Sequence, residues 1–272
     1  MMPSLYVVAT PIGNLEDISL RALRTLREVR LIAAEDTRKT KRLLNTYDIK
    51  TPMTSYHEHS KQSKLDYILA YLEENKVALV SEAGMPGISD PGYELIVAAS
   101  QRGIPIIPIP GPSAVITALT ISGLTAEKFI YLGFLPRKAN GRRRLLKTVA
   151  NEYGTIITLE SPHRLLATLK DILLVLGDRR IAVCRELTKI HEEIFRGEIS
   201  RAIEYFAEPK GEFTLVIEGE KNEDKQPLTE DIEHRLHQMR LSGVTAKEAI
   251  NTIAMETGLT RKELYRAWLK TD

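Results

Sequence analysis

Short apolar runs that end in turns rich in proline and glycine dominate the first half of this 272-residue chain. Amphipathic segments with a helical spacing of leucines lie between these runs. The predicted strands are residues 6–9, 30–34, 77–80 and 104–109. This alternation is typical of an α/β domain whose mostly parallel sheet carries helices on both faces. Because parallel strands end on one edge of the sheet, we expect the turns after them to lie together.

Three of these turns have the composition of a ligand-binding loop, at residues 10–14, 81–92 and 108–114. Proline fixes φ and glycine lacks a Cβ, so such loops stay rigid while a ligand approaches the backbone closely. Ordinary strand-to-helix turns would account for one such loop, but the loop at 81–92 is too long for a routine connection. None of them is a Gly-x-Gly-x-x-Gly turn of the dinucleotide-binding type. The sequence therefore predicts a ligand cleft at this edge.

The pattern changes after Gly123, where a second α/β domain is expected to begin. Its predicted elements are strands at 156–159, 181–184, 192–197 and 213–217 and a helix at 165–176. A polar stretch of mixed charge, residues 220–227, then precedes a third segment. We therefore expect domains at residues 1–124, 125–220 and 221–272.

The third segment has the pattern of three short helices. Thr245 with Glu248, and Thr260 with Glu263, have the spacing of capping boxes at two helix starts. Two helices joined by a turn at Gly258 resemble a helix-turn-helix, and a small packing or dimer bundle is an equally open alternative. Trp268 is expected in the core of such a bundle.

The overall composition, with 43% hydrophobic and 27% charged residues, is ordinary for a globular domain. No apolar run approaches the roughly 20 residues that span a bilayer, and no signal peptide is recognisable, so we expect a cytoplasmic protein without a membrane partner. The single cysteine, Cys184, lies in an apolar run and is expected to be a buried, inert thiol.

A net charge of +2 does not by itself indicate nucleic-acid binding, but one stretch is strongly basic. It has no acidic residue, and Ala139–Gly141 is interpreted as a flexible interruption. We predict that its cations contact RNA phosphates, whereas a solvated charged face is the simpler alternative. The six cations are Arg137, Lys138, Arg142, Arg143, Arg144 and Lys147.

Seven segments in this order resemble the tetrapyrrole methylase superfamily, and within it the branch that modifies ribosomal RNA. Together they cover nearly the whole chain. They are residues 10–18, 34–38, 81–92, 108–114, 133–137, 160–164 and 185–193.

The resemblance implies a two-domain α/β fold that binds S-adenosylmethionine in the cleft between the domains, in a homodimer. It also implies a partner, 16S rRNA or the small ribosomal subunit, in which a cytidine 2′-hydroxyl of the decoding region is methylated. The small C-terminal unit with its helix-turn-helix-like pattern would be an addition to this fold. The implied cofactor contacts are Pro11, Gly84, Met85, Pro86, Ile88, Ser113, Ala114, Leu159, Cys184 and Thr214.

Methyl transfer is an in-line displacement that depends on positioning, and it requires no metal. A ribose hydroxyl reacts better beside a proton acceptor or a cation that stabilises the alkoxide. The candidates are Asp36, Glu82, Glu186 and Lys189, of which Lys189 with Glu186 is preferred. A structural ion pair is the alternative for these two residues. His57 and His59 lack the further ligands that a metal needs.

Two other functions stay open at this stage. One is a small-molecule methylase acting on a porphyrinoid. Such relatives commonly have Gly-Asp-Pro where this chain has Gly84-Met85-Pro86, and a macrocycle needs neither the basic stretch nor the helical tail. The other is a nucleic-acid-binding protein without catalytic activity. The intact ligand-binding loops argue against this alternative.

Overall fold

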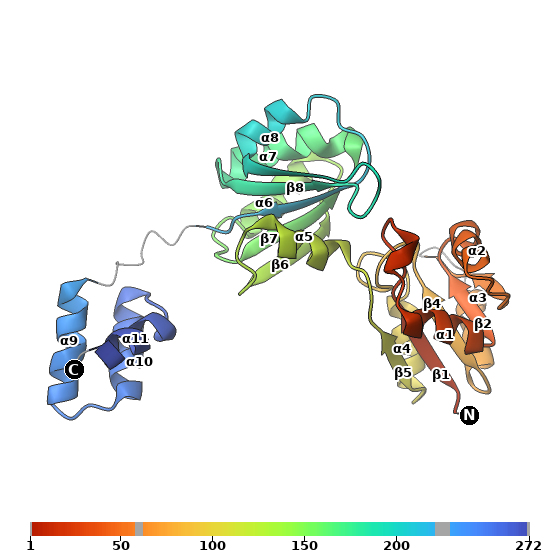
Figure 1. The fold of residues 1–272 in the computed structure, drawn as a ribbon, viewed down its shortest axis with the longest axis horizontal. Helices are drawn as coiled ribbons and strands as arrows, with labels where there is room; N and C mark the ends of the chain where they lie inside the picture. The colour runs from red at the N-terminus through yellow and green to blue at the C-terminus, as the bar shows by residue number, and fades with distance from the viewer. Residues whose placement is uncertain (1, 58–61, 221–228, 271–272) are drawn as a thin grey trace. The chain divides into compact units, whose positions relative to one another are not determined.

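The computed structural model of this chain describes residues 2–57, 62–220 and 229–270 (Figure 1). The chain divides into two compact units, residues 1–219 and 220–272. The first unit holds two five-stranded sheets and the second holds three helices. The segments 1–124 and 125–220, expected as separate domains, therefore share one unit. None of the described helices is long and apolar enough to cross a membrane.

The first sheet is entirely parallel, with the strand order β3-β2-β4-β1-β5. This confirms the parallel α/β interpretation of the first half of the chain. The short strand β3 at the edge of the sheet carried no recognisable pattern, because it has three residues and none is fully buried. The strands are β1 (Ser4–Val8), β2 (Leu31–Ala34), β3 (Met53–Ser55), β4 (Lys76–Val80) and β5 (Ile106–Ile109).

Both faces of the first sheet are buried, because alternate residues of each strand enter different cores. Leu5 and Val7 belong to one core, whereas Val8 belongs to the other. The core containing Val8 includes side chains of α1 (Leu20–Glu28) and α2 (Thr37–Thr46). The opposite core includes side chains of α3 (Gln62–Leu72) and α4 (Tyr93–Gln101).

The second sheet is mixed, with the order β6-β7-β10-β8-β9. Strands β6 and β7 are parallel, and the other three neighbouring pairs are antiparallel. The strands are β6 (Phe129–Phe134), β7 (Thr155–Glu160), β8 (Arg180–Arg185), β9 (Glu193–Glu198) and β10 (Phe213–Ile217).

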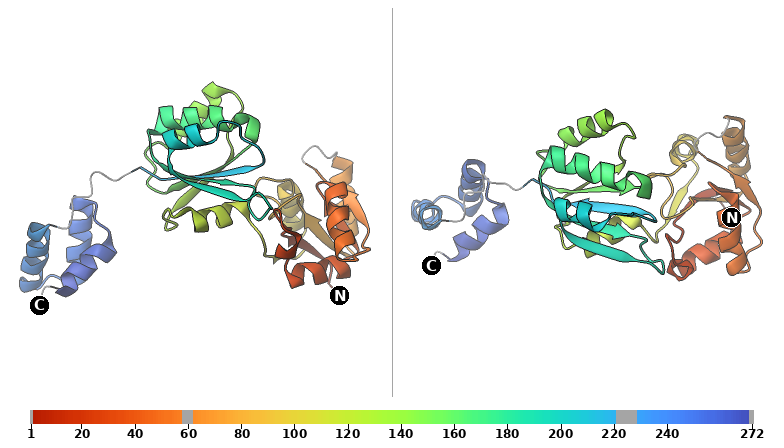
Figure 2. Two further views of the ribbon diagram at one scale, coloured as in Figure 1. Left: turned by 45° about the horizontal axis from the view of Figure 1, so that its top comes forward. Right: turned by 90° about the horizontal axis from the view of Figure 1, so that it is seen from above.

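Helices cover both faces of this second sheet (Figure 2). One face carries α6 (Ala139–Thr148), α7 (Leu165–Leu176) and α8 (Ile199–Tyr205). The other face carries α5 (Ala114–Ser122), whose Ala118 and Leu119 pack with residues of β7, β8 and β10. Helix α5 follows the last strand of the first sheet in the sequence but packs on the second. It therefore ties the two sheets together.

The second unit consists of α9 (Glu230–Leu241), α10 (Ala246–Thr257) and α11 (Arg261–Lys270). Its own core contains Leu236, Ile253, Leu264 and Trp268, which confirms the interior position expected for the tryptophan. The capping box of Thr245 and Glu248 is present. Thr260 and Glu263 make the same reciprocal bonds at the start of α11. Both helix starts are therefore as the sequence predicted.

Candidate functional site

A cavity of about 530 Å³ lies in the first unit, where the carboxyl ends of the first sheet face one end of the second sheet. This volume is in the range of small-molecule binding sites. Loops after β1, β4 and β5 form one side, and residues of β6, β7, β8 and β10 form the other. The cavity thus lies at the edge of the sheet where the sequence predicted a ligand cleft.

Two backbone hydrogen bonds join the loop after β1 to the loop after β4 beside this cavity. The backbone N–H of Thr10 donates to Gly84 O, and that of Gly84 donates to Thr10 O, each at 2.9 Å. Gly84 has φ +78°, a conformation that residues with a Cβ rarely adopt. The Ser81 hydroxyl also donates to Gly84 O at 3.2 Å. These bonds hold the loop backbone rigid beside the cavity.

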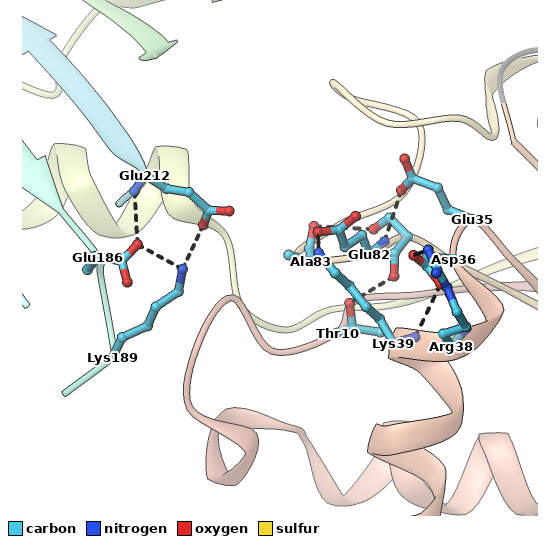
Figure 3. A network of polar contacts seen from close by, with 11 residues as sticks. Thr10, Glu35, Asp36, Arg38, Lys39, Glu82, Ala83, Glu186, Lys189 and Glu212 are labelled. Atoms are coloured by element: carbon cyan, nitrogen blue, oxygen red, sulfur yellow. Dashed lines mark hydrogen bonds and ion pairs between the residues drawn. The ribbon is translucent and has the colours of Figure 1, made fainter. Parts of the chain in front are cut away.

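Three carboxylates of the first sheet's loops line the cavity: Glu35, Glu82 and Asp90. Glu35 Oε2 accepts a hydrogen bond of 2.9 Å from the backbone N–H of Glu82 (Figure 3). Burial and the nearby charge of Glu35 raise the pKa of Asp90 to about 6, although a hydrogen bond from Ser81 opposes this. Acidic side chains therefore line this side of the cavity and favour a cationic ligand, with Glu82 partly neutralised by Lys39.

Asp36, one of the predicted catalytic residues, does not line the cavity. Its Oδ1 caps α2 by accepting from the backbone N–H groups of Arg38, at 2.8 Å, and Lys39, at 3.3 Å. These hydrogen bonds lower the pKa of Asp36. The structure thus places Asp36 at the start of α2, whereas Glu35, the first residue after β2, lines the cavity. Lys39 forms an ion pair with Glu82 at the same edge.

Lys189 and Glu212 line the opposite side of the cavity, with Glu186 behind them. Lys189 Nζ donates to Glu186 Oε1 at 3.0 Å and to Glu212 Oε2 at 2.8 Å (Figure 3). Burial acts to lower the pKa of Lys189, but these two hydrogen bonds outweigh it and raise the pKa. Lys189 is therefore a cation at neutral pH. Lys189 and Glu186 thus form an ion pair, the contact that the sequence left open as the alternative to a catalytic role.

The turn that carries Lys189 is strained and tightly enclosed. Glu186 has φ +50° and Thr188 has φ +66°. Thr188 Oγ1 accepts from the backbone N–H of Asn14 at 2.9 Å. A Cβ on Gly13 would lie 2.6 Å from Lys189 Cγ and 2.8 Å from Leu187 O. The absence of a side chain at Gly13 thus lets the loop after β1 close against this turn.

A second link crosses the site between Ser89, in the loop after β4, and Tyr131 of β6, whose hydroxyl groups form a hydrogen bond. Both residues line the cavity. Burial raises the pKa of Tyr131, so its hydroxyl stays protonated. The two sheets are therefore joined by a polar bridge beside Asp90.

Eight of the ten expected cofactor contacts line the cavity, and they come from both sheets. The other two, Pro11 and Pro86, are buried and do not line it. Burial raises the pKa of Cys184 to about 11, so this thiol stays neutral, as expected of an inert cysteine. The eight are Gly84, Met85, Ile88, Ser113, Ala114, Leu159, Cys184 and Thr214.

Sequence reasoning missed Glu35, Asp90, Tyr131 and Glu212 as cavity residues. Asp90 lies in loop 81–92, which was predicted to bind a ligand, and its neighbours Ser89 and Pro91 are typical of a rigid turn. Tyr131 and Glu212 carried no such signal, since they belong to the part of the chain that forms the second sheet and meet the first sheet's loops only in the tertiary structure.

The structure corrects the interpretation of the basic stretch. Ala139–Gly141 form the first turn of α6 and not a flexible interruption. Arg142 is 4% exposed, and its Nε donates to Asp171 Oδ2 at 2.7 Å. Arg143 Nε donates to Asp171 Oδ1 at 2.7 Å. The stretch is therefore partly neutralised by an acid of α7, and the buried Arg142 is not a surface contact. The exposed cations are Arg137, Lys138, Arg143, Arg144 and Lys147, of which Arg143 is paired with Asp171.

Over the described residues there is no cluster of three or more histidine, cysteine, aspartate or glutamate side chains that would suit a metal ion. His59, considered with His57 for such a role, lies outside the described residues.

Comparison with known proteins adds four findings. Residues 4–203 match the family model described as Tetrapyrrole (Corrin/Porphyrin) Methylases. A protein of Halalkalibacterium halodurans named ribosomal RNA small subunit methyltransferase I is 49% identical over 97% of this chain and 94% of its own length. A Thermotoga maritima protein of the same name is 52% identical over 81% of this chain and 100% of its own length. The crystal structure of diphthine synthase has the same fold, with a TM-score of 0.65 at 12% identity over 79% of this chain and 89% of that one.

Proposed function

Because this chain belongs to the tetrapyrrole (corrin/porphyrin) methylase family, we propose that it is a methyltransferase acting on the ribosomal RNA of the small subunit. The observation that carries this proposal is the 49% identity, over 97% of the chain, to a relative named for that activity. Methylation of a small porphyrinoid is the alternative. The identity to rRNA methyltransferases over almost the full length favours the RNA substrate.

The proposed methyl donor is S-adenosylmethionine, which supplies a methyl group on a positively charged sulfur. The cavity suits such a ligand, because Glu35, Glu82 and Asp90 place negative charge around it. Apolar side chains such as Leu159 and Phe213 line the same cavity and suit an adenine ring. The bonded loops around Gly84 expose rigid backbone groups, which would orient the ligand.

The proposed acceptor is the ribose 2′-hydroxyl of a cytidine in the decoding region of 16S rRNA. S-adenosylmethionine bound in the cavity would supply the methyl group to this oxygen and leave as the neutral thioether, and a carboxylate of the cavity would accept the hydroxyl proton. The protonated Lys189, held by Glu186 and Glu212, donates a hydrogen bond that stabilises the developing alkoxide. Since Lys189 is already a cation, it does not act as the base.

The exposed cations of α6 and the segment before it, Arg137, Lys138, Arg144 and Lys147, are proposed to contact RNA phosphates, with Arg143 as a partly exposed contributor. We also place the protein in the cytoplasm, where its substrate is found, and propose that it acts as a homodimer, as the family resemblance implies.

The test is transfer of labelled methyl from S-adenosylmethionine to small subunits purified from cells that lack this enzyme, with naked 16S rRNA in parallel. Nuclease digestion then identifies the modified nucleoside. We expect 2′-O-methylcytidine. Cofactor binding without transfer to either RNA would contradict the proposal and favour the small-molecule alternative.

A further inference from the structure

The second unit contains a groove of about 700 Å³ that the proposed reaction does not use. It runs between α10 and α11 and is lined by residues of both helices. Three of them are cations and one is a tyrosine. The lining residues are Ala246, Lys247, Ile250, Asn251, Arg261, Tyr265 and Arg266.

The cations of this groove have no acidic partner among the described residues. Lys247, Arg261 and Arg266 are all exposed, and the structure shows no ion pair for any of them within its described ranges. The acids of these two helices are engaged elsewhere. Glu248 and Glu263 cap their own helices, and Glu256 pairs with Arg235 of α9 at 2.6 Å. The positive charge of the groove is therefore uncompensated.

Helix stability gives no reason for this arrangement of charge. Lys247 is in the first turn of α10, and Arg261 is the first residue of α11. Helix N-termini carry a partial positive charge, so a cation there opposes the helix dipole. Two cations at unfavourable positions, beside the third at Arg266, point to an anionic ligand rather than to folding.

The side chains of the groove indicate which class of anionic ligand it binds. Tyr265 is 51% exposed and stands on α11 between Arg261 and Arg266 in the sequence. An exposed aromatic ring among arginines suits a nucleic acid, whose phosphates pair with the cations while a base or ribose packs on the ring. Asn251 adds an amide that can both donate and accept hydrogen bonds. An acidic protein segment would use the cations but not the ring.

We propose that the groove between α10 and α11 is an RNA-binding site that holds the sugar–phosphate backbone of the ribosomal RNA substrate outside the methyl-transfer cavity. The proposal rests on the proposed function for the identity of the RNA. It assigns the second unit to substrate capture and not to chemistry.

The test uses the full-length protein and naked 16S rRNA, with binding measured over a series of salt concentrations. The triple variant Lys247→Ala/Arg261→Ala/Arg266→Ala should weaken binding about tenfold or more and reduce the slope of log affinity against log salt by roughly two to three. Tyr265→Ala should weaken binding, and Tyr265→Phe should retain it. The matched control is Arg235→Ala against Arg266→Ala, since each removes one arginine of the unit but only the second lines the groove.

Two further measurements make the result decisive. The triple variant should unfold at the same or a higher temperature than the parent, and its affinity for S-adenosylmethionine should be unchanged. An unchanged affinity and salt slope on naked rRNA would overturn the proposal, and a loss confined to assembled subunits would then indicate an acidic protein partner. If the parent protein itself neither binds nor methylates RNA, the proposed function fails instead.

Discussion

Gly13 lies directly against the side-chain stem of Lys189, so that a Cβ at position 13 would be 2.6 Å from Lys189 Cγ. The contact joins the loop after β1 of the first sheet to the turn after β8 of the second. Because Leu187 O would also lie at 2.8 Å, rotation of the lysine alone does not relieve the overlap. The position of the Lys189 ammonium group thus depends on the absence of a side chain at Gly13.

The first prediction concerns this contact. Gly13→Ala should move the turn of Lys189, lower the rate of methyl transfer and reduce the free energy of unfolding by about 1–3 kcal/mol, as overpacking does. Rates and thermal unfolding should be compared with Gly103→Ala, where φ is +69° but a Cβ meets no atom within 4 Å. That control should lose stability through backbone strain alone and keep its rate. Equal rates for both variants would contradict the positioning role.

The second prediction concerns Lys189 itself. Lys189→Met keeps an unbranched stem of similar shape but removes the ammonium group, and it should lower kcat by roughly 10²–10³, the range for loss of one donor to a developing oxyanion. Cofactor affinity, measured by calorimetry, should change little. Glu212→Gln retains the Glu186 partner of the ammonium group and should have a smaller effect. A kcat near that of the parent for Lys189→Met would leave the ion pair as a purely structural feature.

The third prediction is a pH dependence at Asp90. Its pKa in the folded protein, about 6, lies above the ordinary value of 3.8, so the folded state binds more protons than the unfolded state between these values. The contribution of Asp90 to the free energy of unfolding is therefore fully present below about pH 4 and is lost as the pH rises through about 6. Asp90→Asn should lack this decline in denaturant titrations, whereas the exposed Asp17→Asn should retain it.

Binding of the cationic cofactor should follow the opposite trend. Its affinity should increase as the pH rises through about 6, because only the ionised Asp90 attracts positive charge. Asp90→Asn should bind the cofactor weakly and without this pH dependence. An affinity that is flat with pH in the parent protein would show that Asp90 does not face the ligand's charge.

The fourth prediction separates two neighbouring arginines of α6. Arg142→Ala should reduce the free energy of unfolding by about 3 kcal/mol, because it leaves the buried Asp171 with only Arg143 as its partner. Arg144→Ala, at an exposed position, should leave stability unchanged and weaken RNA binding. Chemical denaturation and filter binding of both variants test this. The reverse pattern would return Arg142 to the RNA-binding set.

The fifth prediction concerns independence of the two units. Deletion of residues 220–272 should leave the cofactor affinity and the thermal unfolding of the first unit unchanged, because each unit has its own core. RNA affinity should fall. A truncated protein that no longer binds the cofactor would contradict this division of roles.

The sequence by itself determined most of the strands and most of the loops that line the cavity. Short apolar runs that alternate with amphipathic segments predicted the parallel first sheet, and the turns rich in proline and glycine located Gly84, Met85 and Ser113. Local rules of this kind work because φ restrictions and helix capping depend on residues a few positions apart. The capping boxes of the tail follow from the same short-range physics.

Only the tertiary structure decided which charges remain free and which groups meet. Asp171 neutralises Arg142 from 29 residues away, and Lys189 reaches Glu212 across 23 residues. Asp36 and Glu35 are adjacent in the sequence, yet one caps a helix and the other lines the cavity. The first of these contacts depends on how α7 packs beside α6, and the second depends on the pairing of β8 with β10. Such long-range contacts set burial and charge pairing, which no local pattern in the sequence encodes.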